Sequence, residues 1–131
     1  MKKYMAVAAT TDKCVENWGG TSEFTNKAIS QLADSAIGKL VLLDFDETKR
    51  VGKIIESKNE NGDLVIKFVI EDKNFDVDIK MRCVPGFKVD SDKWVEPKEG
   101  VHRIIDEAES ISYGLTYKPA EKDLPEIKSI T

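Results

Sequence analysis

Residues 50–70 read RVGKIIESKNENGDLVIKFVI, and this stretch decides the fold class. The Asn61-Gly62 pair in its middle supplies the positive backbone angles that a tight hairpin turn requires. Residues 50–57 and 63–70 are therefore predicted to be two paired strands. Apolar side chains alternate on both faces of the second strand, with Lys67 as the charged exception. We expect both faces of this second strand to be partly buried.

A helix is predicted upstream of the hairpin, over residues 21–38. Apolar residues recur there every four positions along one stripe, at Phe24, Ala28, Leu32 and Ala36. Thr21 or Ser22 is expected to cap the first amides, and Gly38 to close the helix in a left-handed conformation. Residues 40–45 then form an almost wholly apolar run, which predicts a central strand covered on both faces.

Alternation of apolar and charged residues continues downstream of the hairpin. Residues 75–83 have a period of two, which predicts a strand with Cys83 on its inward face, in the core. Pro85-Gly86 is expected to interrupt the ladder, and polar loops are predicted at residues 90–93 and 97–100. Two further strands are predicted, at residues 101–108 and 111–117.

Length and charge narrow the class of protein. The chain has 131 residues, 40% hydrophobic and 34% charged, which suits one compact domain. A formal net charge of -4 gives no basic surplus for nucleic acid, and no apolar run reaches the roughly 20 residues of a membrane helix. We expect a soluble domain over residues 1–118 that has no export signal and binds neither nucleic acid nor membrane. Residues 119–131 are expected to form an extended, charged tail or docking arm.

The chain has few histidines and cysteines, the kinds of residue that often catalyse reactions or bind metals. His102 is the only histidine, and Cys14 and Cys83 lie 69 positions apart, which is not the spacing of a metal-ligand pair. The glycines form no phosphate-binding loop. No metal and no cofactor is therefore predicted.

Five short segments follow one another in a recognisable order, GKLVLLDFD at 38–46, RVGKI at 50–54, GDLVI at 62–66, VPGFKV at 84–89 and LTYKPA at 115–120. This order resembles the prohead protease family of tailed bacteriophages over about residues 18–120. The resemblance implies an α+β fold similar to the herpesvirus assemblins, with a mainly antiparallel, barrel-like twisted sheet and one main helix. It also implies descent from enzymes that cleave scaffold and capsid proteins inside the immature head.

Reacting groups are missing from the catalytic positions that the resemblance implies. Phe45 stands where the family has its histidine, Val84 stands where it has its serine, and the third position falls at Ser110. A hydroxyl without a base is a poor nucleophile, so a working serine protease is not expected. Cys83 and His102 stay open as a substitute pair, although the alternation buries Cys83 and a surface position suits His102.

The resemblance therefore predicts a non-enzymatic structural protein of a phage or prophage, that is, a capsid decoration, auxiliary or head-assembly protein. Its partner would be the major capsid protein and its location the phage head, after synthesis in the bacterial cytoplasm; homo-oligomers are compatible with this role. The contacts are assigned to loop aromatics and to apolar residues of the tail, namely Trp18, Trp94, Leu124, Pro125 and Ile127. For the two tryptophans, half-burial in a small core is the alternative. A divergent maturation protease and a cytoplasmic protein-binding adaptor stay open as other functions.

Overall fold

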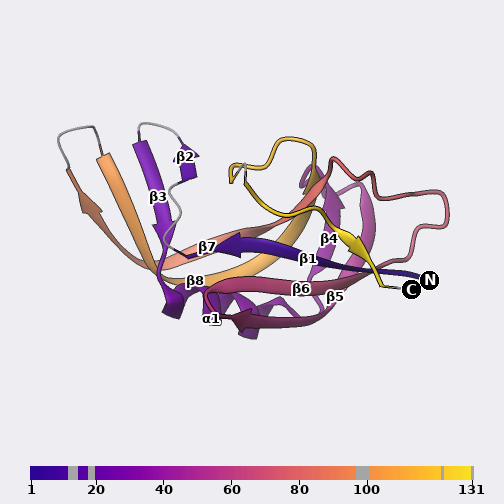
Figure 1. Cartoon of the computed structure of the whole chain (residues 1–131), viewed down its shortest axis with the longest axis horizontal. Helices are drawn as coiled ribbons and strands as arrows, with labels where there is room; N and C mark the ends of the chain where they lie inside the picture. Colours follow the sequence, from indigo (N-terminus) through magenta and orange to yellow (C-terminus); the bar gives the residue numbers. More distant parts are fainter. Residues whose placement is uncertain (12–14, 18–19, 97–100, 122, 131) are drawn as a thin grey trace.

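The computed structural model describes residues 1–11, 15–17, 20–96, 101–121 and 123–130. Within these residues the chain forms one helix and nine strands, and the nine strands belong to one sheet (Figure 1). The helix is α1 (Asn26–Ala36), and the strands are β1 (Lys2–Thr10), β2 (Val15–Asn17), β3 (Gly20–Phe24), β4 (Leu40–Leu43), β5 (Arg50–Glu60), β6 (Asp63–Ile70), β7 (Arg82–Val95), β8 (Val101–Thr116) and β9 (Lys128–Ser129).

Strand β8 organises the sheet. It pairs with β7 along one edge, while its other edge pairs in parallel with β3 near its start and with β4 near its end. The order then continues from β4 through β5, β6 and β1 to β9. Helix α1 connects β3 to β4 and covers the part of β8 between them. There the side chains of Gln31 and Ser35 accept hydrogen bonds from the amides of Ala108 and Ser110, at 3.0 and 2.9 Å. The helix thus satisfies backbone donors that lie between the two parallel partners of β8.

The predicted fold class is wrong. The structure is predominantly β rather than α+β, because the one described helix has 11 residues whereas strands make up most of the described chain. The sheet is also open and mixed rather than barrel-like. Strand β1 passes close to β7, yet no ladder joins them within the described residues. An apolar cleft, lined by side chains of both strands, lies between them.

The predicted hairpin is confirmed. Strands β5 and β6 pair antiparallel from Glu60 opposite Asp63 onward, and the turn residues Asn61 and Gly62 have φ values of 53° and 91°. Leu64, Ile66 and Phe68 are buried on one face of β6, and Val65 and Val69 are buried on the other. Both faces of β6 are thus covered, as its pattern indicated, whereas β5 keeps one exposed face.

The predicted helix begins too early. Residues 21–24 belong to β3, and α1 begins at Asn26 with Thr25 as its cap, whose hydroxyl accepts the Ala28 amide at 3.2 Å. Phe24 is buried, but it lies in the strand that precedes the helix. The end is predicted correctly, because Gly38 has φ 85°. The central strand is confirmed over residues 40–43 as β4, which pairs with β5 on one side and β8 on the other, whereas Asp44 and Phe45 lie in a turn.

The strand predicted at residues 75–83 is wrong up to Met81. The carboxylates of Asp72 and Asp78 accept the amides of Asn74 and Lys80, at 2.9 and 2.8 Å, and these local turns replace a ladder. Cys83 is nevertheless buried, as the alternation predicted.

Beyond Cys83 the sheet is more continuous than the sequence predicts. Strand β7 passes through Pro85-Gly86 and residues 90–93, and β8 is one strand rather than two. Proline is tolerated because β7 pairs with β8 alone, so the missing amide is not needed on the other edge. Bulges after Gly86 and around Ser91 absorb the irregular sequence. The loop predicted at residues 97–100 lies outside the described residues.

Both ends of the chain add strands that the sequence patterns do not predict. Strand β1 is rich in alanine, a residue with low β propensity, yet it pairs with β6 and buries Ala6, Ala8 and Ala9. Within the tail, β9 pairs with β1 at Tyr4 and Met5, so the two termini lie beside each other (Figure 1). The tail packs on the domain along this route.

Candidate functional site

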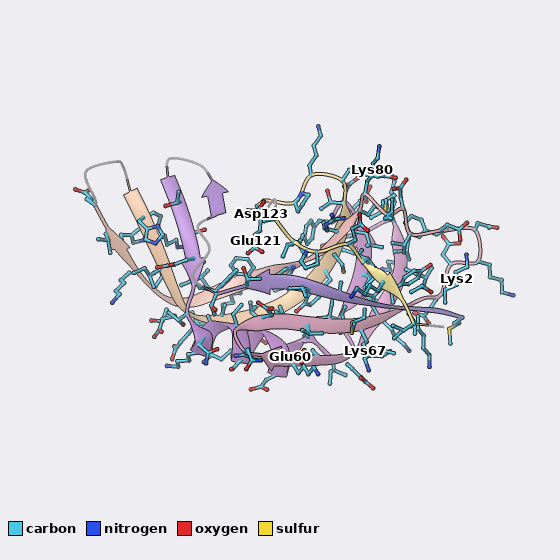
Figure 2. The ribbon with its side chains drawn as sticks, in the orientation of Figure 1. Lys2, Glu60, Lys67, Lys80, Glu121 and Asp123 are labelled. Carbon is cyan, nitrogen blue, oxygen red and sulfur yellow. The ribbon has the colours of Figure 1, made fainter. Side chains whose placement is uncertain are left out.

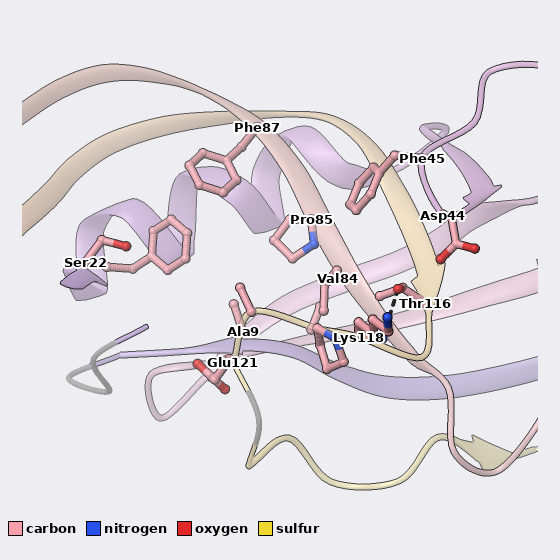
Figure 3. Close-up of a pocket in the computed structure, with 14 residues that line it drawn as sticks. Ala9, Ser22, Asp44, Phe45, Val84, Pro85, Phe87, Thr116, Lys118 and Glu121 are labelled. Atoms are coloured by element: carbon pink, nitrogen blue, oxygen red, sulfur yellow. Dashed lines mark hydrogen bonds between the residues drawn. The ribbon is translucent and has the colours of Figure 1, made fainter. Parts of the chain in front are cut away.

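An apolar cleft of about 370 Å³ lies between β1, β3, β7 and the segment that follows β8 (Figure 3). Alanine, proline, valine and phenylalanine dominate its wall. The lining residues are Ala8, Ala9, Ser22, Phe24, Asp44, Phe45, Val84, Pro85, Phe87, Thr116, Lys118, Pro119, Ala120 and Glu121. Such a cleft suits an apolar group whose polar end reaches the rim.

Phe45 enters the cleft from a strained turn. Asp44 and Phe45 have φ values of 50° and 58°, and the amide of Asp46 donates to the carbonyl of Leu43 at 3.0 Å. Two successive left-handed residues form the turn type that normally carries asparagine and glycine. For phenylalanine this conformation costs about 1–2 kcal/mol. The turn places the Phe45 ring over β7 and β8, where it covers Gly86 and Gly114. Phe45 as a whole stays 39% exposed.

The tail forms the remaining wall. We call residues 117–130 the C-terminal strap. Glu121 Oε1 accepts hydrogen bonds from the hydroxyl and amide of Thr10, at 2.8 and 3.3 Å, and Arg82 Nε donates to the carbonyl of Leu124 at 2.9 Å. These contacts tie the strap to the end of β1 and to the start of β7. Figure 2 shows Glu121 and Asp123 on the stretch of the strap that passes beside β1.

Charged and polar groups stand around the apolar wall. Asp44, Lys118 and Glu121 contribute to the lining, and the amide of Lys118 donates to Thr116 Oγ1 at 3.1 Å (Figure 3). Next to them the Tyr117 hydroxyl donates to Asp78 Oδ2 at 3.2 Å. Desolvation and then the Asp78 carboxylate raise the pKa of Tyr117, so this phenol keeps its proton at neutral pH.

Two of the three positions assigned from the resemblance meet in this cleft. Phe45 and Val84 both line it, although they are 39 positions apart in the chain. Ser110 lies elsewhere, 1% exposed beneath α1. Its hydroxyl donates to the carbonyl of Leu32 at 2.9 Å and lies 2.9 Å from the hydroxyl of Tyr113. The structure therefore joins Phe45 to Val84 and separates Ser110 from both.

The residues assigned to protein binding have different surroundings. Trp94 is 63% exposed near the end of β7, with the Arg103 guanidinium 5.3 Å from its ring centre. Leu124 is buried against this chain, Ile127 packs partly against the core, and Pro125 is exposed. Trp18 lies outside the described residues. Trp94 and Pro125 are thus the two with open surfaces in the described part of the chain.

Cys83 and His102 do not form a pair. Cys83 lies opposite Leu115 and His102 lies opposite Val95, so thirteen positions of β8 separate them. Burial raises the pKa of the Cys83 thiol, which leaves it protonated and unreactive.

His102 contacts other side chains. Its Nδ1 lies 2.6 Å from Thr21 Oγ1, and its Nε2 lies 3.1 Å from Glu23 Oε1. Sequence reasoning missed Thr21 and Glu23 because it assigned them to the helix. Their spacing of two would have placed both on one face of a strand.

Within the described residues, no three His, Cys, Asp or Glu side chains gather as metal ligands, and the single helix is too short to cross a membrane. Comparison with known proteins adds no relative. No family model matches the chain, and no curated protein or solved structure is significantly similar to it. The likeness to prohead proteases thus stays an interpretation of the sequence.

Proposed function

We propose that this chain is a structural protein of a phage or prophage head whose apolar cleft binds the major capsid protein. One observation carries the proposal: Phe45 and Val84, to which the resemblance assigns the former catalytic pair, line one cleft. A chance resemblance gives no reason for two positions 39 residues apart to meet in space. The bacteriophage context comes from the sequence resemblance.

Apolar side chains at these two positions favour binding over cleavage in the cleft. An aromatic ring and two methyl groups stand where the resemblance implies a base and a nucleophile, and the only histidine, His102, is not among the lining residues. The cleft runs between the edges of β1 and β7, which suits an extended segment of the partner with one apolar side chain inserted.

Each such contact is weak, so the proposal depends on repetition. Burying one large apolar side chain contributes roughly 1.5–3 kcal/mol, which does not hold two proteins together at low concentration. A head presents many copies of its major protein, and many weak contacts on one surface give avidity. This chain would therefore bind assembled heads much more strongly than the isolated capsid protein.

Photocrosslinking tests the proposal. The chain would carry p-benzoylphenylalanine in place of Lys118 at the cleft, or in place of the exposed Lys53 on β5 as the matched control. Both proteins would be incubated with heads of the phage whose genome encodes the chain. We expect a crosslink to the major capsid protein from position 118 and not from position 53. Equal crosslinking from both positions, or a chain that does not sediment with heads, would overturn the proposal.

A second test of the proposed function places a charge in the cleft. Val84→Lys places an ammonium group against the apolar wall and should abolish sedimentation with heads. Ile111→Lys is the control, because Ile111 is 59% exposed on β8 and lies outside the cleft lining. If both variants sediment like the unchanged chain, the cleft is not the binding site.

A further inference from the structure

Two side chains of β3 and one of β8, on the sheet face opposite the cleft, form a nucleophile-base-acid arrangement. Strands β3 and β8 pair in parallel with Thr21 beside His102, and Glu23 follows two positions later on the same face. Ser22 and Phe24, which alternate with them, line the cleft on the other face. The arrangement is therefore separate from the site of the proposed function.

The two contacts of the imidazole fit one tautomer of the neutral ring. A neutral ring with its proton on Nε2 satisfies both: Nε2–H donates to Glu23 Oε1 at 3.1 Å, and Nδ1 accepts the Thr21 hydroxyl at 2.6 Å. In this state Glu23 orients the ring, and the free lone pair of Nδ1 faces the threonine proton. A hydroxyl bonded to a base that a third group orients is the signature of an activated nucleophile.

Thr21, His102 and Glu23 are partly buried. Partial burial keeps these side chains accessible and still shields their charges from water. The side chains of His102 and Glu23 are 16% and 24% exposed. Val95 lies directly opposite His102 in the β7–β8 ladder and is 43% exposed. Opposed residues of a ladder share a face, so Val95 offers apolar surface beside the imidazole. This surface suits the acyl chain of a small carboxylic ester.

We propose that Thr21, His102 and Glu23 form an acyl-transfer site for small apolar carboxylic esters, with Thr21 as the nucleophile. Thr21 Oγ1 bonds to the carbonyl carbon of the ester while its proton passes to His102 Nδ1. The tetrahedral adduct collapses, the carbon–oxygen bond to the alcohol breaks, and His102 returns the proton to the departing oxygen. Water then attacks the threonine ester with His102 as base, which releases the acid and restores the hydroxyl. Glu23 is a positioning residue that holds the ring and the charge it gains.

Acylation by p-nitrophenyl butyrate tests the site, with the acylated residue located by peptide mass spectrometry after an acid quench. Thr48 is the internal reference, because its exposed hydroxyl donates to Asp46 Oδ1 at 2.6 Å rather than to an imidazole. General-base assistance should acylate Thr21 about 100-fold faster than Thr48. Acylation at Thr21 no faster than at Thr48 would overturn the proposal.

Variants separate catalysis from structure. His102→Gln keeps hydrogen-bonding capacity towards both neighbours but lacks a base, so it should reduce acylation of Thr21 to the level of Thr48. Thr21→Ser should still be acylated at position 21, which would show that the fold tolerates substitution there. Glu23→Gln should lower the rate and leave the acylated residue unchanged. Acylation of Thr21 that persists at full rate in His102→Gln would refute the role of the imidazole. Head binding is measured separately with Val84→Lys, so either proposal can fail alone.

Discussion

The ring of Phe45 lies against the α-carbon of Gly114, so that a β-carbon at position 114 would stand 2.6 Å from both Cδ2 and Cζ of the ring. Gly86, on the adjacent strand β7, is covered by the same ring, with Cε1 2.9 Å from the corresponding position. Two glycines on neighbouring strands thus form the floor on which Phe45 rests. Any larger residue at Gly114 would push the ring out of the cleft wall.

Gly114→Ala should therefore destabilise the protein by about 1–3 kcal/mol, the usual cost of overpacking. Urea unfolding at 25 °C measures the change in unfolding free energy. Repeating the substitution in a Phe45→Ala background gives a double-mutant cycle, in which Gly114→Ala should cost much less because the ring is gone. Equal costs in the two backgrounds would show that the ring contact is not the reason for glycine at position 114.

The left-handed backbone at Phe45 predicts an inverted order of two substitutions. Phe45→Gly should be more stable than Phe45→Ala by about 1 kcal/mol, because glycine adopts φ near 58° without steric cost. At Lys53, within β5, the order should be the normal one, with alanine better than glycine by about 0.5–1 kcal/mol. Thermal and urea unfolding of the four variants measure both differences. An alanine advantage at position 45 would contradict the assigned backbone conformation.

Local signals explain which parts of the fold the sequence predicts. Asn61-Gly62 determines its hairpin through its own backbone angles, and Gly38 ends the helix in the same way. Thr21 is different, since it pairs with His102, 81 positions away, and no local pattern shows that contact. The helix-like stripe through Phe24 was misleading, because burial against β8 also places Phe24 in the core.

The candidate sites follow the same rule. The resemblance assigned Phe45 and Val84 to one site, but the alanine-rich wall of β1 carries no motif, and nothing in the segment at residues 115–120 indicates that it lies beside β1. Asp72 and Asp78 illustrate a competing local effect, since their carboxylates cap turns and override an alternation that reads as a strand.

Ser110 is expected to be a structural residue. Its hydroxyl donates to the Leu32 carbonyl and accepts from the Tyr113 hydroxyl, both within the core. Ser110→Ala leaves two buried polar groups without this partner and should cost about 1–3 kcal/mol in unfolding free energy. The Ser110→Ala/Tyr113→Phe double variant should cost less than the sum of the two single variants. Strict additivity in urea unfolding would refute the coupling.

The burial of Cys83 predicts that the protein loses stability in alkaline solution. Burial raises the pKa of its thiol in the folded chain, so the stabilising contribution is complete below the ordinary thiol pKa of about 8.5. Above that pH the unfolded chain releases a proton that the folded chain retains, and stability falls by at most about 1.4 kcal/mol per pH unit.

Urea unfolding at pH 8 and pH 10 should show this loss in a Cys14→Ser background, where Cys83 is the remaining thiol. Adding Cys83→Ala should make the loss smaller, while burial of Tyr113, which raises its pKa too, accounts for part of the remainder. A pH dependence unchanged by Cys83→Ala would contradict the assignment. Native Cys83 should also react far more slowly with Ellman's reagent than the urea-unfolded chain.

The C-terminal strap should be part of the folded domain. Leu124 is 4% exposed, and its carbonyl accepts from Arg82 at the start of β7. Leu124→Ala should cost about 2–5 kcal/mol, whereas Pro125→Ala, at an exposed neighbouring position, should change stability by less than about 0.5 kcal/mol.

Limited proteolysis distinguishes a packed strap from a free arm. Leu124 anchors the strap, so Leu124→Ala should speed cleavage within residues 117–130 by at least the factor by which it raises the unfolded fraction of the protein. Pro125→Ala should leave the cleavage rate unchanged. Rapid cleavage of the unchanged chain at these residues would mean that the tail is free. Since the strap also forms one wall of the cleft, Leu124→Ala should weaken binding to heads as well.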